Sequence, residues 1–391
     1  MKKINFFIPY FVITLSLISQ ILLRENNLAL RYPNNLIFIL ILVFAILSAK
    51  LFLKDTKLIN YFSSIPAAIG SIVPFTILVL FMGFIPQNNE SQNIIINYLS
   101  LDNIINSQLY FVLSLYLVLV LSFTIVKRIK PLTIKNVSFL LNHFGLWLVI
   151  VSASMGSADI IRLKMFCKYD TPCWQGVDDK GNYYEMPFAL ELKKFIIDEW
   201  NPQIVIYNSK KDETILSKKN DDLSSGKIIS IKNYKIKIDT FYTKSIYSNG
   251  KFHPIYSEGA VFSAHITLLN NPKINGWISS PSHIYSPILL SIDSTYYVAM
   301  TNPAPKKYHS ELKLYTPDQK NKKIQIEVNK PYKHNEWEMY QISYDSSKGQ
   351  WSEYSVIEVI KDPWLPVVFT GIFMLIAGSV LLFILGKKQK I

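Results

Sequence analysis

Cysteine, glycine and charged residues are all scarce in this chain of 391 residues. The two cysteines, Cys167 and Cys173, do not have the C-x-x-C spacing of a redox dithiol or of a haem-attachment site. The 14 glycines form neither a phosphate-binding loop nor a G-x-S-x-G elbow. Since 50% of the residues are hydrophobic and only 18% are charged, the composition excludes a disordered chain and a single soluble domain. Signatures of a soluble enzyme are therefore missing.

Acidic residues are almost absent from one part of the chain. Of the 28 Asp and Glu residues, 24 lie between Gly156 and Trp364, together with 27 of the 41 Lys and Arg residues. Most of the net charge of +13 thus falls outside this stretch, in short segments between apolar runs. Because no basic face with interleaved aromatic residues is present, the charge argues against nucleic-acid binding. We interpret it as a signal of membrane topology.

Six apolar runs are long enough to cross a lipid bilayer, which takes roughly 17 to 25 residues each. The first is interpreted as a retained helix, since no small-x-small cleavage site precedes Arg24. The pattern predicts a polytopic α-helical membrane protein with six transmembrane helices, and one large soluble stretch inserted before the last helix. The runs begin near Ile4, Leu36, Ile65, Leu109, Phe139 and Trp364.

Lysine and arginine residues in the short loops predict the orientation in the membrane. The segments between the apolar runs fall alternately on the two sides of the membrane. On one side the only basic residues are Arg24 and Arg31, and the loop from Pro86 to Gln108 on that side carries Glu90 and Asp102 but no basic residue. Both termini are therefore predicted to be cytoplasmic, and the absence of a transit-like N-terminus favours a bacterial inner membrane. The segments on the opposite side contain twelve basic residues: Lys2, Lys3, Lys50, Lys54, Lys57, Lys127, Arg128, Lys130, Lys135, Lys387, Lys388 and Lys390.

Residues 157–363 change from apolar runs to alternating patterns rich in Ile, Val, Tyr and Phe. Turn sequences such as Ser224-Ser225-Gly226 separate the segments, which indicates short antiparallel strands. We predict an extracytoplasmic all-β domain, sandwich-like or barrel-like, between a membrane domain of residues 1–156 and a C-terminal helix and tail of residues 364–391. The expected strand segments are Gln203 to Tyr207, Lys227 to Tyr242, Ala260 to Leu269, Ile288 to Met300, Lys322 to Val328 and Met339 to Tyr344.

Histidines and cysteines of this predicted domain indicate no catalytic centre. The histidines lie 12 to 26 residues apart, which is not the close pairing of common zinc sites, so we interpret them as structural or surface residues. For Cys167 and Cys173, a structural disulfide or unpaired thiols are favoured over redox chemistry, and no role is assigned to them. The five histidines are His253, His265, His283, His309 and His334.

His143 is the only histidine in any apolar run. A polar ring in hydrocarbon costs free energy, so a neighbour or a ligand is expected to satisfy it. Four residues into the fifth run corresponds to a depth of about 6 Å, in the inner leaflet. Trp147 lies one turn further on nearly the same face, and Gly145 leaves room close by. This pattern suits a metalloporphyrin, with His143 as an axial ligand to the iron and Trp147 packing beside it. A histidine hydrogen-bonded to another helix is the alternative.

Several short motifs recur in a fixed order along the chain. They resemble the ResB (CcsB) family of cytochrome c biogenesis proteins over roughly Phe139 to Gly378. Their order and their placement against the predicted membrane make the resemblance specific. The motifs are Asn142-His143-Phe144-Gly145-Leu146-Trp147, Gly156-Ser157-Ala158-Asp159, Met186 to Leu192 with Phe195 and Asp198, Tyr340 to Asp345, Ser355-Val356, and Asp362 to Val368 with Gly371.

The resemblance implies a subunit of the System II cytochrome c synthetase, a haem lyase complex in which this chain would not act alone. Such subunits work with a CcsA (ResC) partner to move haem b outward and present it to apocytochrome c. By the same resemblance His143 would be one axial ligand of the haem iron, with the second ligand supplied by a CcsA helix. The partner's W-G-x-x-W-x-W-D run is absent here, so the chain resembles the ResB half only. No catalytic residue is assigned to it.

Two other hypotheses are left open by the residues themselves. The chain would be a non-catalytic membrane scaffold or assembly factor if His143 is only a packing residue. It would be a membrane-anchored ligand-binding protein if its outer β domain captures a ligand. Bound haem that depends on His143 would separate the first hypothesis, a synthetase subunit, from both alternatives.

Overall fold

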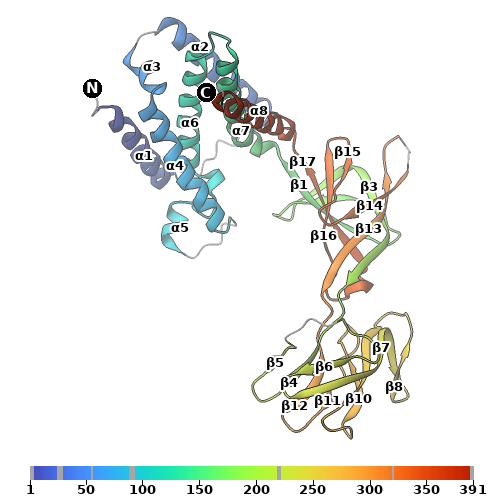
Figure 1. The fold of residues 1–391 in the computed structure, drawn as a ribbon. Helices are drawn as coiled ribbons and strands as arrows, with labels where there is room; N and C mark the ends of the chain where they lie inside the picture. Colours follow the sequence, from blue (N-terminus) through green and yellow to red (C-terminus); the bar gives the residue numbers. More distant parts are fainter. Residues whose placement is uncertain are drawn as a thin grey trace. The chain divides into compact units, whose positions relative to one another are not determined.

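The computed structural model describes residues 4–23, 30–53, 56–87, 93–217, 222–318 and 321–387 (Figure 1). Its contacts divide the chain into a helical unit, Met1–Ile161 with Asp362–Ile391, and a β unit, Arg162–Lys361. Seven charged residues used to predict the orientation lie outside the described residues. They are Lys2, Lys3, Arg24, Lys54, Glu90, Lys388 and Lys390.

Five helices of the helical unit are long and apolar enough to cross a membrane: α2, α4, α6, α7 and α8. Helix α1 contributes a shorter apolar stretch, Phe7–Leu23. Apolar membrane helices are therefore confirmed, whereas the count of six stays a prediction. The helices are α1 (Ile4–Leu23), α2 (Asn34–Phe52), α3 (Lys57–Phe62), α4 (Ile65–Phe84), α5 (Ile94–Tyr98), α6 (Gln108–Lys127), α7 (Ile134–Gly156) and α8 (Leu365–Lys387), with short 3-10 turns at Ile104–Asn106 and Ser157–Asp159.

Helix α7 begins at Ile134, five residues before the apolar run that marks it in the sequence. The polar first turn belongs to the helix because the Thr133 hydroxyl accepts a hydrogen bond from the backbone N–H of Asn136 at 3.3 Å. His143 consequently lies nine residues into α7, about 13 Å along its axis. The depth of about 6 Å is counted from the start of the apolar run and not from the start of the helix, so it stays a prediction.

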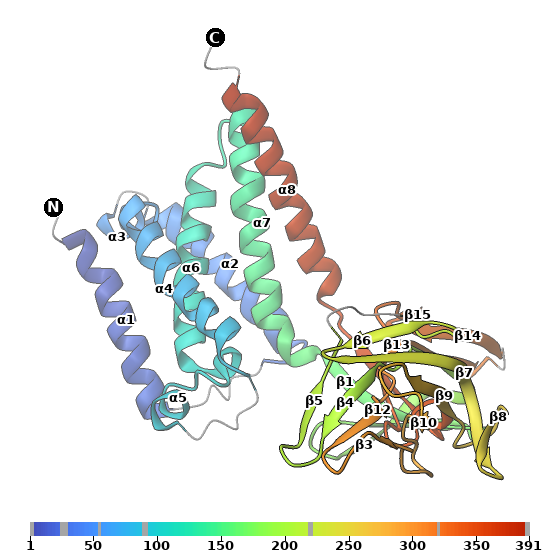
Figure 2. The same ribbon diagram turned by 60° about the horizontal axis from the view of Figure 1, so that its bottom comes forward.

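Helix α6 is the most extensively buried helix of this unit and contacts α1, α2, α4 and α7. Its Leu117, Val118 and Leu121 form one apolar cluster with Trp147 and Ile150 of α7. Helices α7 and α8 run side by side along most of their length (Figure 2). His143 therefore lies on a helix that packs against both α6 and α8.

The first lobe of the β unit is an eight-stranded antiparallel sheet in the order β14-β13-β3-β2-β1-β17-β16-β15. The sheet curls so that β14 approaches β16, and Met165, Leu190, Leu312 and Ile357 are buried inside the curl. The strands are β1 (Ile161–Lys168), β2 (Cys173–Val177), β3 (Tyr183–Glu199), β13 (Pro305–Tyr315), β14 (Lys322–Glu327), β15 (Tyr332–His334), β16 (Trp337–Tyr344) and β17 (Tyr354–Lys361).

The second lobe contains two further antiparallel sheets, β10-β9-β7-β6 with β8 on β7, and β11-β12-β4-β5. Isoleucines of both sheets, such as Ile206, Ile238 and Ile266, share one buried core. The predicted large all-β domain is thus confirmed. The strands are β4 (Ile204–Asn208), β5 (Glu213–Ile215), β6 (Ile228–Ile231), β7 (Tyr234–Ser248), β8 (Lys251–Pro254), β9 (Val261–Leu268), β10 (Asn275–Ser279), β11 (Leu290–Ser291) and β12 (Tyr296–Met300).

Two segments that the sequence presents as single strands are each divided by a turn. Between β6 and β7 the turn passes through Lys232, which has a positive φ of 49°. Between β11 and β12 the Asp293 carboxylate accepts the backbone N–H groups of Thr295 and Tyr296, at 2.7 and 2.8 Å. Side-chain and backbone hydrogen bonds of this kind compete locally with the strand ladder. Hydrophobic alternation alone does not reveal them.

Candidate functional site

His143 makes a hydrogen bond that fixes its tautomer. Its Nδ1 lies 2.9 Å from the backbone carbonyl oxygen of Phe139, one turn earlier on α7. A carbonyl oxygen only accepts, so Nδ1 must carry the proton and donate. In the neutral imidazole this leaves the Nε2 lone pair unprotonated, and Nε2 has no hydrogen-bond partner among the described residues. The ring therefore presents the nitrogen form that binds a metal.

An aromatic ring and a cation accompany the imidazole. The His143 ring stacks on Phe139, with 3.7 Å between ring centroids and 22° between the planes. The guanidinium carbon of Arg128, just after the end of α6, lies 4.3 Å from the Phe139 centroid. Within the described residues no carboxylate pairs with Arg128. The positively charged guanidinium of Arg128 therefore lies against the same Phe139 ring on which the imidazole stacks.

The contacts of Trp147 do not include the His143 ring. Its indole N–H donates to the Ser122 hydroxyl of α6 at 2.8 Å, and the side chain is only 8% exposed. The indole stacks on Phe144, with 5.7 Å between centroids. The structure thus pairs His143 with Phe139 and Trp147 with Phe144. These are contacts of a packing residue between α6 and α7, and a contact of Trp147 with a porphyrin stays a prediction.

A small apolar cavity of about 110 Å³ lies beside Trp147, between α2, α6 and α7. Val43 and Ile46 of α2 and Ile125 of α6 contribute to its walls. Ligand pockets of proteins commonly measure about 300 to 1,000 Å³, so this cavity is too small for a porphyrin. A haem on His143 would therefore lie outside this cavity.

The space beside Gly145 is occupied by α8. A Cβ atom at Gly145 would lie 2.7 Å from the carbonyl oxygen of Gly371 and 2.9 Å from the backbone nitrogen of Leu375. Gly371 is equally close to α7, since its Cβ would lie 2.7 Å from a methyl carbon of Val149. The expectation that Gly145 leaves room for a porphyrin is therefore wrong. Glycines on both helices instead permit the close approach of α7 and α8.

Asp159, at the end of α7, is a functional candidate that the sequence showed only as part of a motif. Its carboxylate accepts hydrogen bonds from the backbone N–H of Tyr32, the amide of Asn35 and the indole N–H of Trp364, at 2.8, 2.7 and 2.7 Å. Asn35 also donates to the carbonyl oxygen of Met155. One carboxylate thereby joins the N-terminal regions of α2 and α8 to the end of α7. In the sequence, the only sign of this role is that Asp159 is an acidic residue at the end of an apolar run.

Two histidines of the β unit form ion pairs. His265 lies 3.2 Å from Asp239, and His283 lies 3.2 Å from Glu258. In the part of the chain that the structure describes, no group of three His, Cys, Asp or Glu side chains is placed to hold a metal ion. Nothing in these ion pairs indicates a catalytic centre.

Both cysteines are free thiols. Cys167 is fully buried in the core of the first lobe, and Cys173 packs half-buried against the same core. Burial raises the pKa of the Cys167 thiol well above its usual value. A buried thiol of raised pKa is a poor nucleophile, so Cys167 is suited to packing.

Together these features define a helical membrane protein that carries a large all-β unit and, on α7, a histidine whose Nε2 has no hydrogen-bond partner in the described part of the chain. The family model of the ResB-like family matches residues 133–353, from the N-cap of α7 to the turn before β17. The chain belongs to the ResB-like family, which confirms the resemblance found in the motifs. It is accordingly a membrane protein related to cytochrome c biogenesis. No curated protein matches the sequence.

Proposed function

We propose that this chain is the ResB-like subunit of a System II cytochrome c synthetase. In this function it acts with a CcsA (ResC) partner to export haem and deliver it to apocytochrome c outside the cytoplasm. Membership of the ResB-like family supports the proposal. The observation that carries it is the hydrogen bond from His143 Nδ1 to the Phe139 carbonyl oxygen, because this bond leaves Nε2 free as an axial ligand.

The residues around His143 fit a haem that is cargo rather than a resident cofactor. His143 is the single histidine of the helical unit, so one axial position is supplied here and the other is left to a partner helix. Haem carries two anionic propionates, and the region from the end of α6 to the first turn of α7 is basic, with Lys127, Arg128, Lys130 and Lys135. Cations near the helix ends would attract the propionates while the iron binds the imidazole.

The same proposal places the protein in a bacterial inner membrane, with both termini cytoplasmic and the β unit outside. The excess of Lys and Arg in one set of loops supports this orientation. Protease added to intact spheroplasts would test it, with epitope tags at both termini. We expect digestion of the β unit and protection of both tags. Protection of the β unit would contradict the orientation.

Spectroscopy of the protein copurified with a CcsA partner tests the haem site. We expect a Soret band for the wild type, its loss in His143→Gly, and its recovery when imidazole is added to that variant. His253→Gly, on β8 of the β unit, is the matched control and should leave the band unchanged. If the His143→Gly complex kept an undiminished Soret band, His143 would not be a haem ligand, and the scaffold hypothesis would be favoured.

A further inference from the structure

The β unit has two lobes that are joined by two chain segments. Residues 200–203 connect β3 to β4, and residues 301–304 connect β12 to β13 (Figure 1). In the described part of the chain, the buried core of the first lobe and that of the second have no residue in common. Lobes with separate cores are expected to move relative to each other unless a large apolar interface holds them together.

The link between the lobes is an interrupted ribbon of two strands. Strands β3 and β13 pair in the first lobe, and β4 and β12 pair in the second, both antiparallel. Pro202 and Pro303 lie within the link and have no N–H to donate, so the ladder of hydrogen bonds is broken there. The ribbon can therefore bend at this point. Two backbone hydrogen bonds cross the link, from the Trp200 N–H to the Ala304 carbonyl oxygen at 2.8 Å and from the Thr301 N–H to the Gln203 carbonyl oxygen at 2.9 Å.

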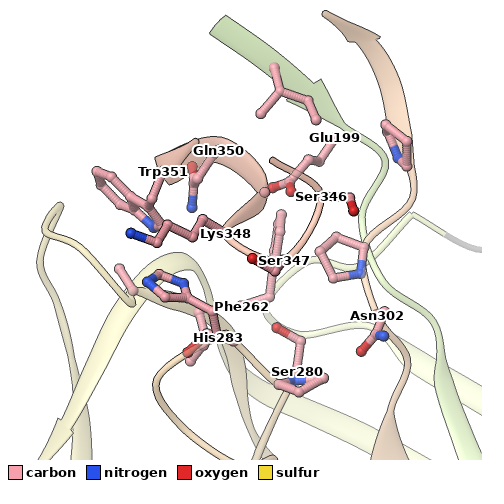
Figure 3. Close-up of a pocket in the computed structure, with 18 of the residues that line it drawn as sticks. Glu199, Phe262, Ser280, His283, Asn302, Ser346, Ser347, Lys348, Gln350 and Trp351 are labelled. Atoms are coloured by element: carbon pink, nitrogen blue, oxygen red, sulfur yellow. The ribbon is translucent and has the colours of Figure 1, made fainter. Parts of the chain in front are cut away.

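A cleft of about 390 Å³ lies beside this link and is lined by both lobes (Figure 3). The first lobe contributes Gln350 and Trp351, on the short 3-10 turn before β17, and the second lobe contributes Ser280 and His283. Because its walls belong to different lobes, the width of the cleft depends on the angle between them.

Two contacts beyond the link join the lobes. Glu199, the last residue of β3, pairs with Lys244 of β7 at 3.2 Å, and the two side chains are only 14% and 23% exposed. The ring of Tyr256, between β8 and β9, lies 5.2 Å from the ring of Trp351, measured between centroids. Removing one partner of a buried ion pair leaves the other charge without compensation. Both contacts therefore favour the arrangement of the lobes seen here.

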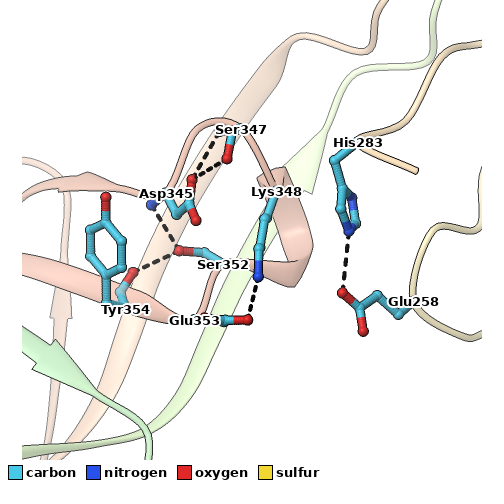
Figure 4. Close-up of polar contacts among 8 residues, drawn as sticks. All are labelled: Glu258, His283, Asp345, Ser347, Lys348, Ser352, Glu353 and Tyr354. Carbon is cyan, nitrogen blue, oxygen red and sulfur yellow. Dashed lines mark hydrogen bonds and ion pairs between the residues drawn. The ribbon is translucent and has the colours of Figure 1, made fainter. Parts of the chain in front are cut away.

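The turn that carries Trp351 is held firmly within the first lobe. The Ser352 hydroxyl accepts the backbone N–H of Asp345 at 2.8 Å and donates to the carbonyl oxygen of Tyr354 at 2.6 Å (Figure 4). The ion pair of His283 with Glu258, in the same figure, lies within the second lobe. Contacts within one lobe remain when the lobes separate, so Trp351 would move away from the second lobe together with the first.

The arrangement seen here leaves one polar group without a partner. The indole Nε1 of Trp351 is buried and makes no hydrogen bond with any described residue. A buried N–H group without a partner costs free energy, and water would supply the partner once the lobes separate. This cost and the desolvation of the Glu199–Lys244 pair oppose the two contacts that join the lobes. Opposing contributions of this kind suit an equilibrium between two forms.

We propose that the β unit bends as a hinge at residues 200–203 and 301–304. It alternates between the closed form described here and an open form in which Glu199 is separated from Lys244 and Tyr256 from Trp351. Opening widens the cleft and exposes the Trp351 N–H to water. The movement takes place within the β unit and does not require haem on His143, so it goes beyond the proposed function.

Double electron–electron resonance on the full chain in detergent tests the hinge. One spin label is attached at Ser248→Cys, an exposed position at the end of β7, and the other at Lys323→Cys, an exposed position of β14. Cys173→Ser removes the native thiol that is only half-buried. We expect a predominant closed distance and a minor open one. Glu199→Gln leaves Lys244 without its partner and should raise the open population at least about fivefold.

Further variants separate the hinge from general loss of stability. The charge-swapped pair Glu199→Lys with Lys244→Glu should restore most of the closed population. Trp351→Ala should raise the open population, whereas Trp351→Phe keeps a ring against Tyr256 without the unpaired N–H and should lower it. Glu191→Gln is the matched control, because Glu191 lies on the same strand and pairs with Lys193 within the first lobe at 2.7 Å. It should change the open population by less than about twofold.

Any of four outcomes overturns the proposal. The first is one unchanged distance in the wild type and in every variant, which would show a rigid β unit. The second is equal opening in Glu199→Gln and Glu191→Gln. The third is a charge-swapped variant that stays as open as Glu199→Gln, and the fourth is equal opening in Trp351→Ala and Trp351→Phe.

Discussion

The indole N–H of Trp364 donates to the Asp159 carboxylate at 2.7 Å, although 205 residues separate the two in the sequence. The chain enters β1 two residues after Asp159 and leaves β17 three residues before Trp364. This hydrogen bond therefore joins the two points at which the β unit is inserted into the helical unit. Tyr32 and Asn35, beside the start of α2, donate to the same carboxylate.

Asp159→Ala should destabilise the helical unit by about 1 to 3 kcal/mol, because three donors lose their common acceptor. Trp364→Phe removes one of these donors and should cost less. Thermal unfolding in detergent, followed by near-ultraviolet circular dichroism, measures both changes. In the double variant we expect a coupling free energy of about 0.5 kcal/mol or more. Strictly additive effects would show that the two side chains do not act together.

Gly145→Ala and Gly371→Ala should each lower the stability of the α7–α8 pair by about 1 to 3 kcal/mol, because the added methyl group meets the backbone or side chains of the facing helix. Gly83→Ala is the matched control, since a Cβ atom at that position meets nothing within 4 Å. Its melting temperature should stay the same or rise slightly. The same loss in all three variants would contradict glycine-mediated helix contact.

Trp147→Phe should cost about 1 kcal/mol by removing the hydrogen bond to Ser122, and Ser122→Ala should cause a similar loss of stability. Since the indole packs between α6 and α7, we expect the amount of haem per protein to remain that of the wild type. Absorbance at the Soret maximum relative to protein concentration measures this ratio. A stable Trp147→Phe protein with a weakened Soret band would show that the indole contacts the porphyrin.

Maleimide should label Cys173 in the native protein and label Cys167 only after denaturation. The difference follows from the complete burial of Cys167, whose thiol also has a pKa raised by burial, while Cys173 is half-buried. Mass spectrometry of the labelled protein, with Cys173→Ser as the control, counts the modified thiols. Labelling of neither cysteine unless a reductant is added would indicate a disulfide and contradict free thiols.

Acid should destabilise the β unit partly through Glu191. Hydrogen bonds donated by Lys193 and Tyr315, at 2.7 and 2.5 Å, lower the pKa of Glu191. A carboxylate whose folded-state pKa is lowered stabilises the fold above its unfolded pKa of about 4.3, and this contribution is lost as pH falls through the folded-state value. Glu191→Gln should thus narrow the difference in guanidinium midpoint between pH 7 and pH 3. An unchanged difference would exclude this linkage.

Much of the architecture followed from patterns between near neighbours in the sequence. Apolar runs predicted membrane helices, and alternation predicted a β domain, because both depend on a periodicity of side chains along one element. His143 stood out as the single histidine of an apolar run, and its hydrogen bond to Phe139 spans one helical turn. The apolar run near Phe139 marked this helix but not its first residue, Ile134, because the capped first turn is polar and resembles a loop in composition.

Contacts between segments that lie far apart in the sequence could not be predicted from such local patterns. The sequence showed that Gly145 is small, but only the packing of α7 against Gly371 shows that α8 occupies the space beside it. Likewise, Trp147 and His143 are separated by one turn on α7, yet their rings contact different partners. Which neighbour fills a given space depends on the arrangement of helices that lie far apart in the chain.

The sequence by itself determined the membrane helices, the β character of residues 157–363, the family and the choice of His143, since each depends on composition, local spacing or short motifs. Only the tertiary structure decided which nitrogen of His143 is free, what surrounds Gly145 and Trp147, how Asp159 joins three helices, and where the cleft of the β unit lies. The physical reason is that hydrogen bonds and van der Waals contacts act over a few ångströms. Residues hundreds of positions apart make them only after the chain has folded.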